Sequence, residues 1–144
     1  MRLPPDELKE KRLKQFLERG EMIYGRLDEP QRAVLRRQLE QSIFDPQRIL
    51  AERQRRQQDA LQTLRKVAGQ PIALSDARKL LRAYLERTEN SPDAAYRSYQ
   101  EALIDEACRN IAALHNATSP AQREAAVRRL RGYQRDVREL SAQQ

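Results

Sequence analysis

Apolar residues recur along this chain three or four positions apart, with polar residues between them. That spacing places apolar side chains on one stripe of an α-helix, and no long alternation of Val, Ile and Thr indicates a strand. Six helices are predicted, over about residues 6–25, 28–42, 45–68, 75–89, 92–116 and 120 to nearly the end. The two clearest stripes are Tyr96, Tyr99, Leu103, Ala107, Ile111 and Leu114 in the fifth helix, and Val127, Leu130, Tyr133, Val137 and Leu140 in the sixth.

These elements predict an all-α fold, a helical bundle of about six helices in which the last two are long and antiparallel. The connection over residues 116–119 is short, and short connections favour antiparallel neighbours. We expect the two stripes to form the most stable seam of the bundle, with Leu103 and Leu130 buried there. Truncating either leucine to Ala would then cost about 2–5 kcal/mol. No linker rich in Gly or Ser divides the chain, so residues 1–144 are predicted to form a single helical domain.

Two of the predicted helix starts follow the same pattern, 91 positions apart. Each has a capping residue, then Gln three positions later, then Arg and a run of helix-forming residues. This pattern predicts a capping box, in which the cap side chain accepts from the backbone amide of the Gln and the Gln side chain accepts from the cap amide. Cap, Gln and Arg are Asp28, Gln31 and Arg32 in one start and Ser119, Gln122 and Arg123 in the other. The similarity covers about a dozen residues on each side and does not indicate a structural duplication.

The third predicted helix contains an unusually polar run over residues 52–59. Because the run separates the apolar residues Leu50 and Leu61, we expect it to be solvated or to contact a partner. Arg53, Arg55 and Arg56 would then form a polar recognition face. In the fourth helix, Ser75 is predicted to be the N-terminal cap.

The composition predicts a small basic protein with a thin core. Apolar residues make up 39% of the chain and charged residues 34%, with a formal net charge of +7 and one cysteine. One cysteine excludes an intramolecular disulfide, and no apolar run is long enough to span a membrane. A positive net charge is compatible with binding a polyanion such as nucleic acid. However, acidic residues are interspersed among the basic ones, and no aromatic residues that could stack on bases alternate with the arginines. Nucleic acid is therefore the alternative partner and not the expected one.

Few residues suggest catalytic chemistry. Cys108 and His115 lie seven positions apart, which separates them by about 10 Å along a helix and is too far for a nucleophile–base hydrogen bond. A buried thiol and a hydrogen-bonded imidazole are the favoured interpretation, since a structural zinc site needs four ligands. The four glycines form no phosphate-binding loop. We therefore expect no enzyme activity, no metal and no cofactor. Tyr96 and Tyr99 share a helix face, where they line a groove or pack in the bundle.

Several segments together resemble the carboxy-terminal half of a family of uncharacterised lipoproteins of Gram-negative bacteria, a domain of unknown function. They are residues 21–32, 44–46, 53–57, 91–99, 114–123 and 130–133. The resemblance implies a periplasmic envelope protein made with a signal peptide and a lipid-bearing cysteine near the mature N-terminus. Neither is in this chain, because Cys108 lies deep in a predicted helix. We therefore expect residues 1–144 to be a fragment of a longer precursor that meets the membrane only through that lipid anchor. The family brings no known catalytic residues.

A looser similarity is to small periplasmic stress chaperones with paired LTxxQ motifs. Residues 27–31 keep the Leu and the Gln of that motif but have Asp28 in place of Thr. In the second copy, Thr118 is offset and the Leu is missing. Those chaperones are helical and act by binding partners, so the similarity also implies a binding function.

The predicted function is that of a helical cell-envelope protein which binds another protein or an envelope component and does not catalyse a reaction. The alternative function is a basic cytoplasmic helical module that binds nucleic acid. The predicted binding residues are Gln31, Arg32, Gln122 and Arg123, followed by Arg53, Arg55 and Arg56. For the first four, the alternative is that they build helix ends and bind nothing.

Overall fold

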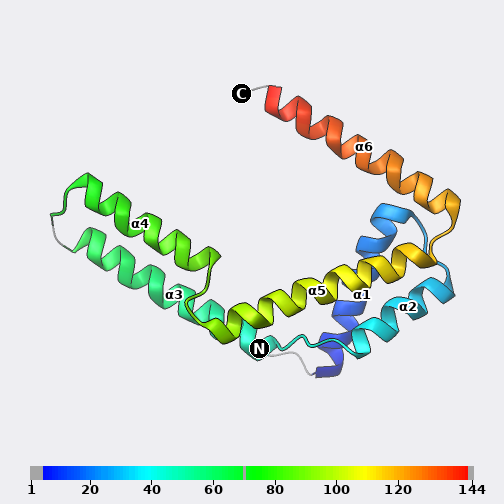
Figure 1. The fold of residues 1–144 in the computed structure, drawn as a ribbon, viewed down its shortest axis with the longest axis horizontal. Coiled ribbons are helices and arrows are strands. Elements are labelled where there is room, and N and C mark those ends of the chain that lie inside the picture. Colours follow the sequence, from blue (N-terminus) through cyan, green and yellow to red (C-terminus); the bar gives the residue numbers. More distant parts are fainter. Residues whose placement is uncertain (1–4, 70, 143–144) are drawn as a thin grey trace. The chain divides into compact units, whose positions relative to one another are not determined.

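The computed structural model describes residues 5–69 and 71–142, and these residues form helices and no strand (Figure 1). The all-α fold class predicted from the apolar spacing is confirmed. The six described helices are α1 (Pro5–Tyr24), α2 (Glu29–Glu40), α3 (Pro46–Ala68), α4 (Leu74–Glu89), α5 (Ala94–Ala117) and α6 (Pro120–Ala142). Among these helices, none combines the length and the apolarity that a membrane crossing requires.

Acidic side chains begin two of the central helices. The Asp45 carboxylate accepts from the backbone amide of Gln47 at 2.8 Å, and Pro46 occupies the first helical position of α3. The Asp93 carboxylate accepts from the amide of Ala95 at 2.9 Å, so α5 begins two residues later than predicted. Each cap satisfies an amide that has no partner inside the helix.

The start of α4 differs from the prediction. The carbonyl of Ala73 already accepts from the amides of Asp76 and Ala77, both at 3.0 Å, and α4 begins at Leu74. Ser75 therefore lies within the first turn and is not the cap, which makes that prediction wrong. No side chain caps α4.

The chain divides into two compact units. Unit 1 consists of Met1–Ser42 and Glu106–Gln144, and unit 2 consists of Ile43–Asp105. Unit 1 therefore contains α1, α2, α6 and the C-terminal part of α5. Unit 2 contains α3, α4 and the N-terminal part of α5.

The apolar core of unit 1 is small and lies around α1. Leu27, Leu35 and Leu114 are buried together, and α1 packs against both α2 and α6. Gly20 allows Leu114 of α5 to lie close to α1, because a Cβ atom at position 20 would be 3.0 Å from Cδ2 of Leu114. Gly25 ends α1 with φ at 80°, a left-handed conformation that favours glycine. Partly buried Leu13, Leu17 and Tyr24 complete the core.

The apolar stripe of α6 is exposed, which corrects the predicted seam between the last two helices. Leu130 is 53% exposed, and Leu103 is half-buried in the other unit. Helix α6 packs through its first turns on α1, where the Arg129 guanidinium donates to the carbonyls of Glu21 and Met22. Beyond that point no other helix of unit 1 lies alongside α6 (Figure 1). Its stripe residues Val127, Leu130, Tyr133, Val137 and Leu140 are each between 43% and 65% exposed.

In unit 2, α3 and α4 form an antiparallel hairpin with a polar interior (Figure 1). The buried side chains among the described residues of this unit are Glu52, Thr63, Ser91 and Tyr99. Leu50 and Leu80 are half-buried, and the other five leucines of the hairpin are exposed. Leu61, Leu64, Leu74, Leu81 and Leu85 are each between 40% and 67% exposed.

Candidate functional site

Both predicted capping boxes are present in unit 1. The Asp28 carboxylate accepts from the amide of Gln31 at 2.9 Å, and the Gln31 side chain accepts from the amide of Asp28 at 3.1 Å. The Ser119 hydroxyl accepts from the amide of Gln122 at 3.2 Å, and the Gln122 side chain accepts from the amide of Ser119 at 2.9 Å. The two boxes begin α2 and α6.

The structure brings the two capping glutamines together. Gln31 Nε2 donates to Gln122 Oε1 at 2.8 Å, and Gln122 Nε2 donates to Gln31 Oε1 at 3.0 Å. Gln31 also donates to the carbonyl of Ala117 at 3.0 Å, and Gln122 to the carbonyl of Arg26 at 3.1 Å. Each of those carbonyls lies two residues before the cap of the opposite helix. Each hydrogen bond made by Gln31 therefore has a counterpart made by Gln122, and the corresponding residues are always 91 positions apart.

The two arginines that follow the glutamines support the turns before their own helices. Arg32 donates to the carbonyl of Leu27 at 3.0 Å and forms an ion pair with Glu21 at 2.6 Å. Arg123 donates to the hydroxyl of Thr118 at 3.3 Å. Gln31, Arg32, Gln122 and Arg123 thus join helix ends within unit 1, and the buried Gln31 is 4% exposed.

Tyr24 and His115, also 91 positions apart, meet at the same end of unit 1. The Tyr24 hydroxyl and His115 Nδ1 are 2.9 Å apart, and the ring centroids are 5.9 Å apart. The expectation of a hydrogen-bonded imidazole is therefore confirmed. Cys108 is exposed, so the expectation of a buried thiol is wrong. Within the part of the chain that the structure describes, no group of three His, Cys, Asp or Glu side chains could hold a metal ion.

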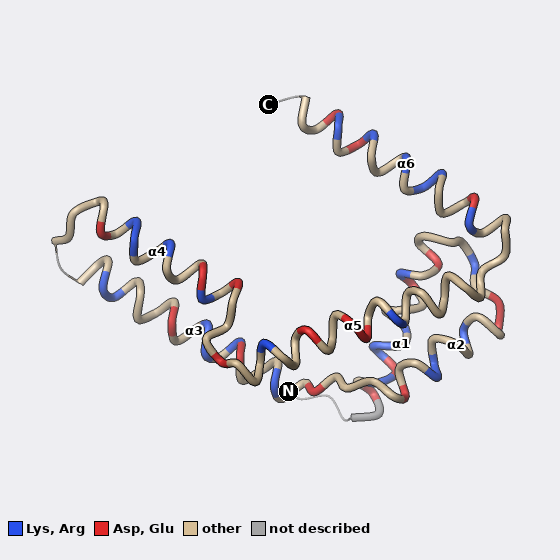
Figure 2. Tube along the Cα trace, in the orientation of Figure 1, with Lys and Arg blue, Asp and Glu red and all other residues tan. Residues whose placement is uncertain are grey.

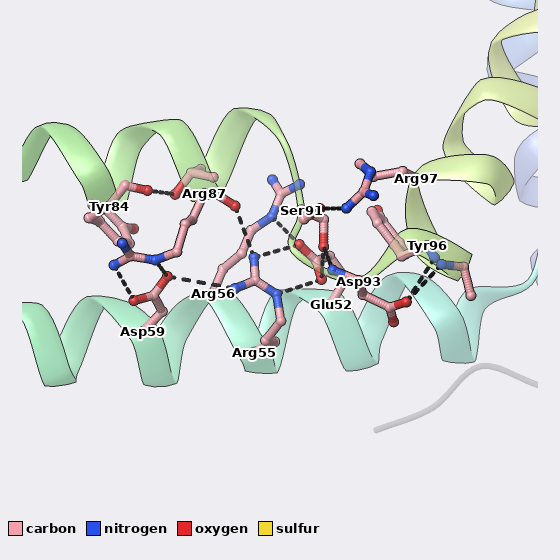
Figure 3. Close-up of polar contacts among 12 residues, drawn as sticks. Glu52, Arg55, Arg56, Asp59, Tyr84, Arg87, Ser91, Asp93, Tyr96 and Arg97 are labelled. Carbon is pink, nitrogen blue, oxygen red and sulfur yellow. Dashed lines mark hydrogen bonds and ion pairs between the residues drawn. The ribbon is translucent and has the colours of Figure 1, made fainter.

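A network of charged side chains joins α3 to α4 in unit 2, and Figure 3 shows these side chains lying between the two helices. Glu52 is 4% exposed and accepts from Arg55 Nε at 2.8 Å and from Arg56 Nε at 2.9 Å. The Ser91 hydroxyl donates to the same carboxylate at 3.2 Å. Arg55 continues to the carbonyl of Arg87 at 3.1 Å. The polar run expected to be solvated is therefore partly an internal seam.

A second ion pair closes the hairpin nearer its tip. Arg87 donates to both carboxylate oxygens of Asp59, at 2.7 and 2.9 Å, and such two-bond pairs fix geometry as well as charge. The hydrogen bond from Arg55 is the main reason that the pKa of Glu52 falls from 4.5 to about 2. The hydrogen bond from Arg87 likewise lowers the pKa of Asp59.

The predicted recognition face is divided by this network. Arg55 and Arg56 form ion pairs with Glu52, whereas Arg53 is exposed and has no ion pair with a described residue. Tyr99 is buried, and its hydroxyl accepts from the amide of Asp45 at 2.6 Å. Tyr96 packs beside Tyr99, with ring centroids 6.1 Å apart, and borders a surface hollow. Tyr99 therefore packs inside the unit, and Tyr96 lines a groove.

The exposed face of α6 is the clearest unoccupied surface of unit 1. Its apolar row lies on one side, and arginines follow one another along the helix (Figure 2). With about 100° per residue, Arg128 and Arg135 lie on the side opposite Leu130 and Val137, and Arg131 borders the apolar row. The helix is therefore apolar on one face and charged on the other, where Glu124 and Glu139 lie among the arginines.

No protein-family model, curated protein or solved structure matches this chain.

The buried position of Glu52 was not predicted from the sequence. One signal was available, because Arg55 and Arg56 follow Glu52 at three and four positions, the spacing at which side chains on one helix face meet. Ser91, which donates to Glu52, and Arg87, which pairs with Asp59, lie 39 and 28 positions beyond those partners, and no local pattern indicates these contacts.

Proposed function

We propose that this chain is a non-catalytic helical binding protein of the bacterial cell envelope, and that α6 contacts its protein partner. The observation that carries the proposal is the row of apolar side chains on α6. Every residue from Tyr133 to Ala142 is exposed, although the row continues the helical spacing of Val127 and Leu130. Exposed apolar rows of this kind are typical of interaction surfaces.

The lack of packing around the C-terminal part of α6 supports α6 as the helix that contacts the partner. A helix of about 12 residues without tertiary packing is marginal in water, because helix stability in proteins comes mainly from a packed apolar face. The C-terminal part of α6 has no such packing within unit 1. A partner that receives Leu130, Val137 and Leu140 in an apolar groove would supply it, in the way that amphipathic helices dock into grooves.

The charge of α6 narrows the kind of partner. Arg131 and Arg138 border the apolar row, and Arg128 and Arg135 lie behind it. An apolar groove with acidic residues at its rim would match this helix, since complementary charge speeds association and rejects partners of the wrong sign. We therefore propose an acidic protein partner.

The envelope location in this proposal rests on the resemblance to lipoproteins of Gram-negative bacteria. Fractionation of the cells that make the native protein tests it. Recovery with detergent-soluble membranes or with the periplasm is expected. Recovery with the cytoplasm would contradict the location without deciding how α6 binds.

Binding through α6 is tested with a matched pair of variants. In Leu130→Ala/Val137→Ala, both substitutions keep the helix, because Ala is the best helix former, and both remove apolar contacts. Glu139→Ala changes an exposed residue away from the row and is the control. The envelope protein captured by the wild-type chain should bind the double variant at least about tenfold more weakly, because each truncated contact residue costs about 1 kcal/mol or more. Equal binding by the two variants would contradict the proposal.

Nucleic acid is tested with the same protein. Arg55 and Arg56 already form ion pairs with Glu52, so the run over residues 53–56 offers less free positive charge than its sequence indicates. Titration of duplex DNA or RNA with the chain at increasing salt is the measurement. Tight binding that weakens steeply with salt would favour the nucleic-acid function instead.

A further inference from the structure

Helix α6 is fixed to unit 1 through its first turns only. The capping box of Ser119 and Gln122 begins the helix, and Ala126 is buried. The Arg129 guanidinium donates to two backbone carbonyls near the end of α1. Every residue from 133 to 142 is exposed, and no other helix of unit 1 lies alongside this part (Figure 1). We call residues 133–142 the free segment.

Gly132 lies where the fixed part of α6 passes into the free segment. A glycine inside a helix makes the helical state about fivefold less favourable than an alanine does, because its backbone loses more conformational freedom. Since α6 is held at its N-terminal end, the free segment can continue this helix only through Gly132. Each such helical state of the free segment therefore carries the cost of the glycine.

The fold does not require a glycine at this position, in contrast to the other three glycines. A Cβ atom at Gly20 would lie 3.0 Å from a core leucine, and one at Gly69 would lie 2.5 Å from a backbone carbonyl oxygen. Gly25 has a positive φ of 80°. Outside the helix backbone, a Cβ atom at Gly132 would meet one described atom, Nη2 of Arg135, at the ordinary contact distance of 4.0 Å. An alanine therefore fits at position 132, and the glycine weakens the helix without serving its packing.

Like charges weaken the helix further on both sides of Gly132. Arg131 and Arg135 are four positions apart, so they are neighbours on the helix surface, where like charges are destabilising. Neither arginine forms an ion pair with a described residue. Acidic side chains at the rim of a partner would relieve this repulsion. The same contacts would therefore bind the helix and favour its formation.

We infer that Gly132 makes the free segment a folding switch, which is unwound most of the time in the isolated chain and becomes helical on the partner. For the identity of that partner, the inference rests on the function proposed above. When only a fraction of the molecules is competent to bind, the apparent dissociation constant is the intrinsic one divided by that fraction. The glycine therefore sets how tightly α6 binds, although it touches nothing in the partner's groove. Position 132 is about 160° round the helix from Leu130 and the apolar row.

The first test compares Gly132→Ala with the wild type in the isolated full chain. Cα chemical shifts of residues 133–142, measured by NMR, give the ratio of the helical to the unwound population. This ratio should rise about fivefold in Gly132→Ala, which is the difference between alanine and glycine in a helix. A free segment that is already fully helical in the wild type overturns the inference. A ratio that is the same in Gly132→Ala also overturns it.

The control is Glu139→Ala, which exchanges two good helix formers in the free segment on the side away from the apolar row. It should change the ratio by about twofold or less. Gly132→Pro is the opposite change, because proline removes a helical hydrogen bond and clashes with the preceding turn. Residues 133–142 should then give the shifts of an unfolded chain. The urea midpoint of unit 1 should stay unchanged, since the contacts that fix α6 lie before Gly132.

Binding of the protein that the wild-type chain captures through α6 tests the second half of the inference. Its dissociation constant should fall by up to about fivefold for Gly132→Ala and change by about twofold or less for Glu139→Ala. Equal affinity of Gly132→Ala and the wild type, with a raised helical population, would overturn the switch. The populations are measured without a partner, so they do not depend on the proposed function. Failure of that function is seen separately, as equal binding of Leu130→Ala/Val137→Ala and its control.

Discussion

Gln31 and Gln122 form a reciprocal pair of side-chain hydrogen bonds at 2.8 and 3.0 Å across 91 positions of sequence. Each glutamine also completes the capping box of its own helix, so the same two amides cap α2 and α6 and bind them to each other. A glutamine amide offers two donors and one oxygen that can accept twice, which is what this double role requires. The residues predicted as a binding site thus have a structural role that their positions explain.

Breaking this pair should destabilise unit 1 in a non-additive way. Gln31→Ala and Gln122→Ala should each reduce the free energy of unfolding by about 1–3 kcal/mol, because each leaves buried polar groups without partners. The double variant should lose about 1 kcal/mol less than the sum, because either single change removes the shared bonds. Urea unfolding followed by circular dichroism measures this. Gln134→Ala, an exposed residue of α6, is the control and should stay within about 0.5 kcal/mol of the wild type.

Two leucines that look equivalent in sequence should differ sharply. Leu35→Ala should reduce the free energy of unfolding by about 2–5 kcal/mol, because Leu35 lies in the core of unit 1. Leu130→Ala should change it by about 0.5 kcal/mol or less at concentrations where the chain has no partner, because Leu130 is exposed. Thermal unfolding of both variants distinguishes the two positions. A large loss in Leu130→Ala would restore the seam between the last two helices.

The stability of unit 2 should depend on pH through Glu52. The pKa of this carboxyl is lowered to about 2 in the fold, so its contribution is fully present above its ordinary value of 4.5 and is lost as the pH falls toward 2. The shift corresponds to about 3 kcal/mol. Glu52→Gln should therefore be less stable than the wild type at pH 7 by about this amount and should approach it near pH 2. A difference that stays constant between pH 7 and pH 2 would show that the charge of Glu52 has no such role.

How far the sequence predicts this structure depends on the range of the interactions. The six helices, to within two residues at each end, and the caps at Asp28, Asp45 and Ser119 were predicted correctly, because they follow from residues within four positions of each other. Helix pairing was not predictable in the same way. The stripe of α6 is apolar because of its own spacing, but whether a neighbour covers Leu130 depends on the direction in which α6 leaves its turn.

The polar seam of unit 2 likewise could not be predicted from local sequence. A polar run at residues 52–59 is ordinarily solvated, and here it is partly internal because Arg87 of α4 and Ser91 of the connection after α4 bond to it. The leucines beside it, Leu61 and Leu64, are each 54% exposed. Periodicity identifies the two faces of a helix, but the long-range ion pairs decide which face is covered.

Amide hydrogen exchange of residues 133–142 in the purified chain, at a concentration well below any self-association, tests most directly that α6 is a helix without a partner. Exchange in this segment should be close to that of an unfolded peptide, while the amides around Leu35 and Leu114 in the core should exchange far more slowly. Slow exchange across residues 133–142 in the isolated chain, comparable to that of the core, would show that α6 is packed within the chain itself.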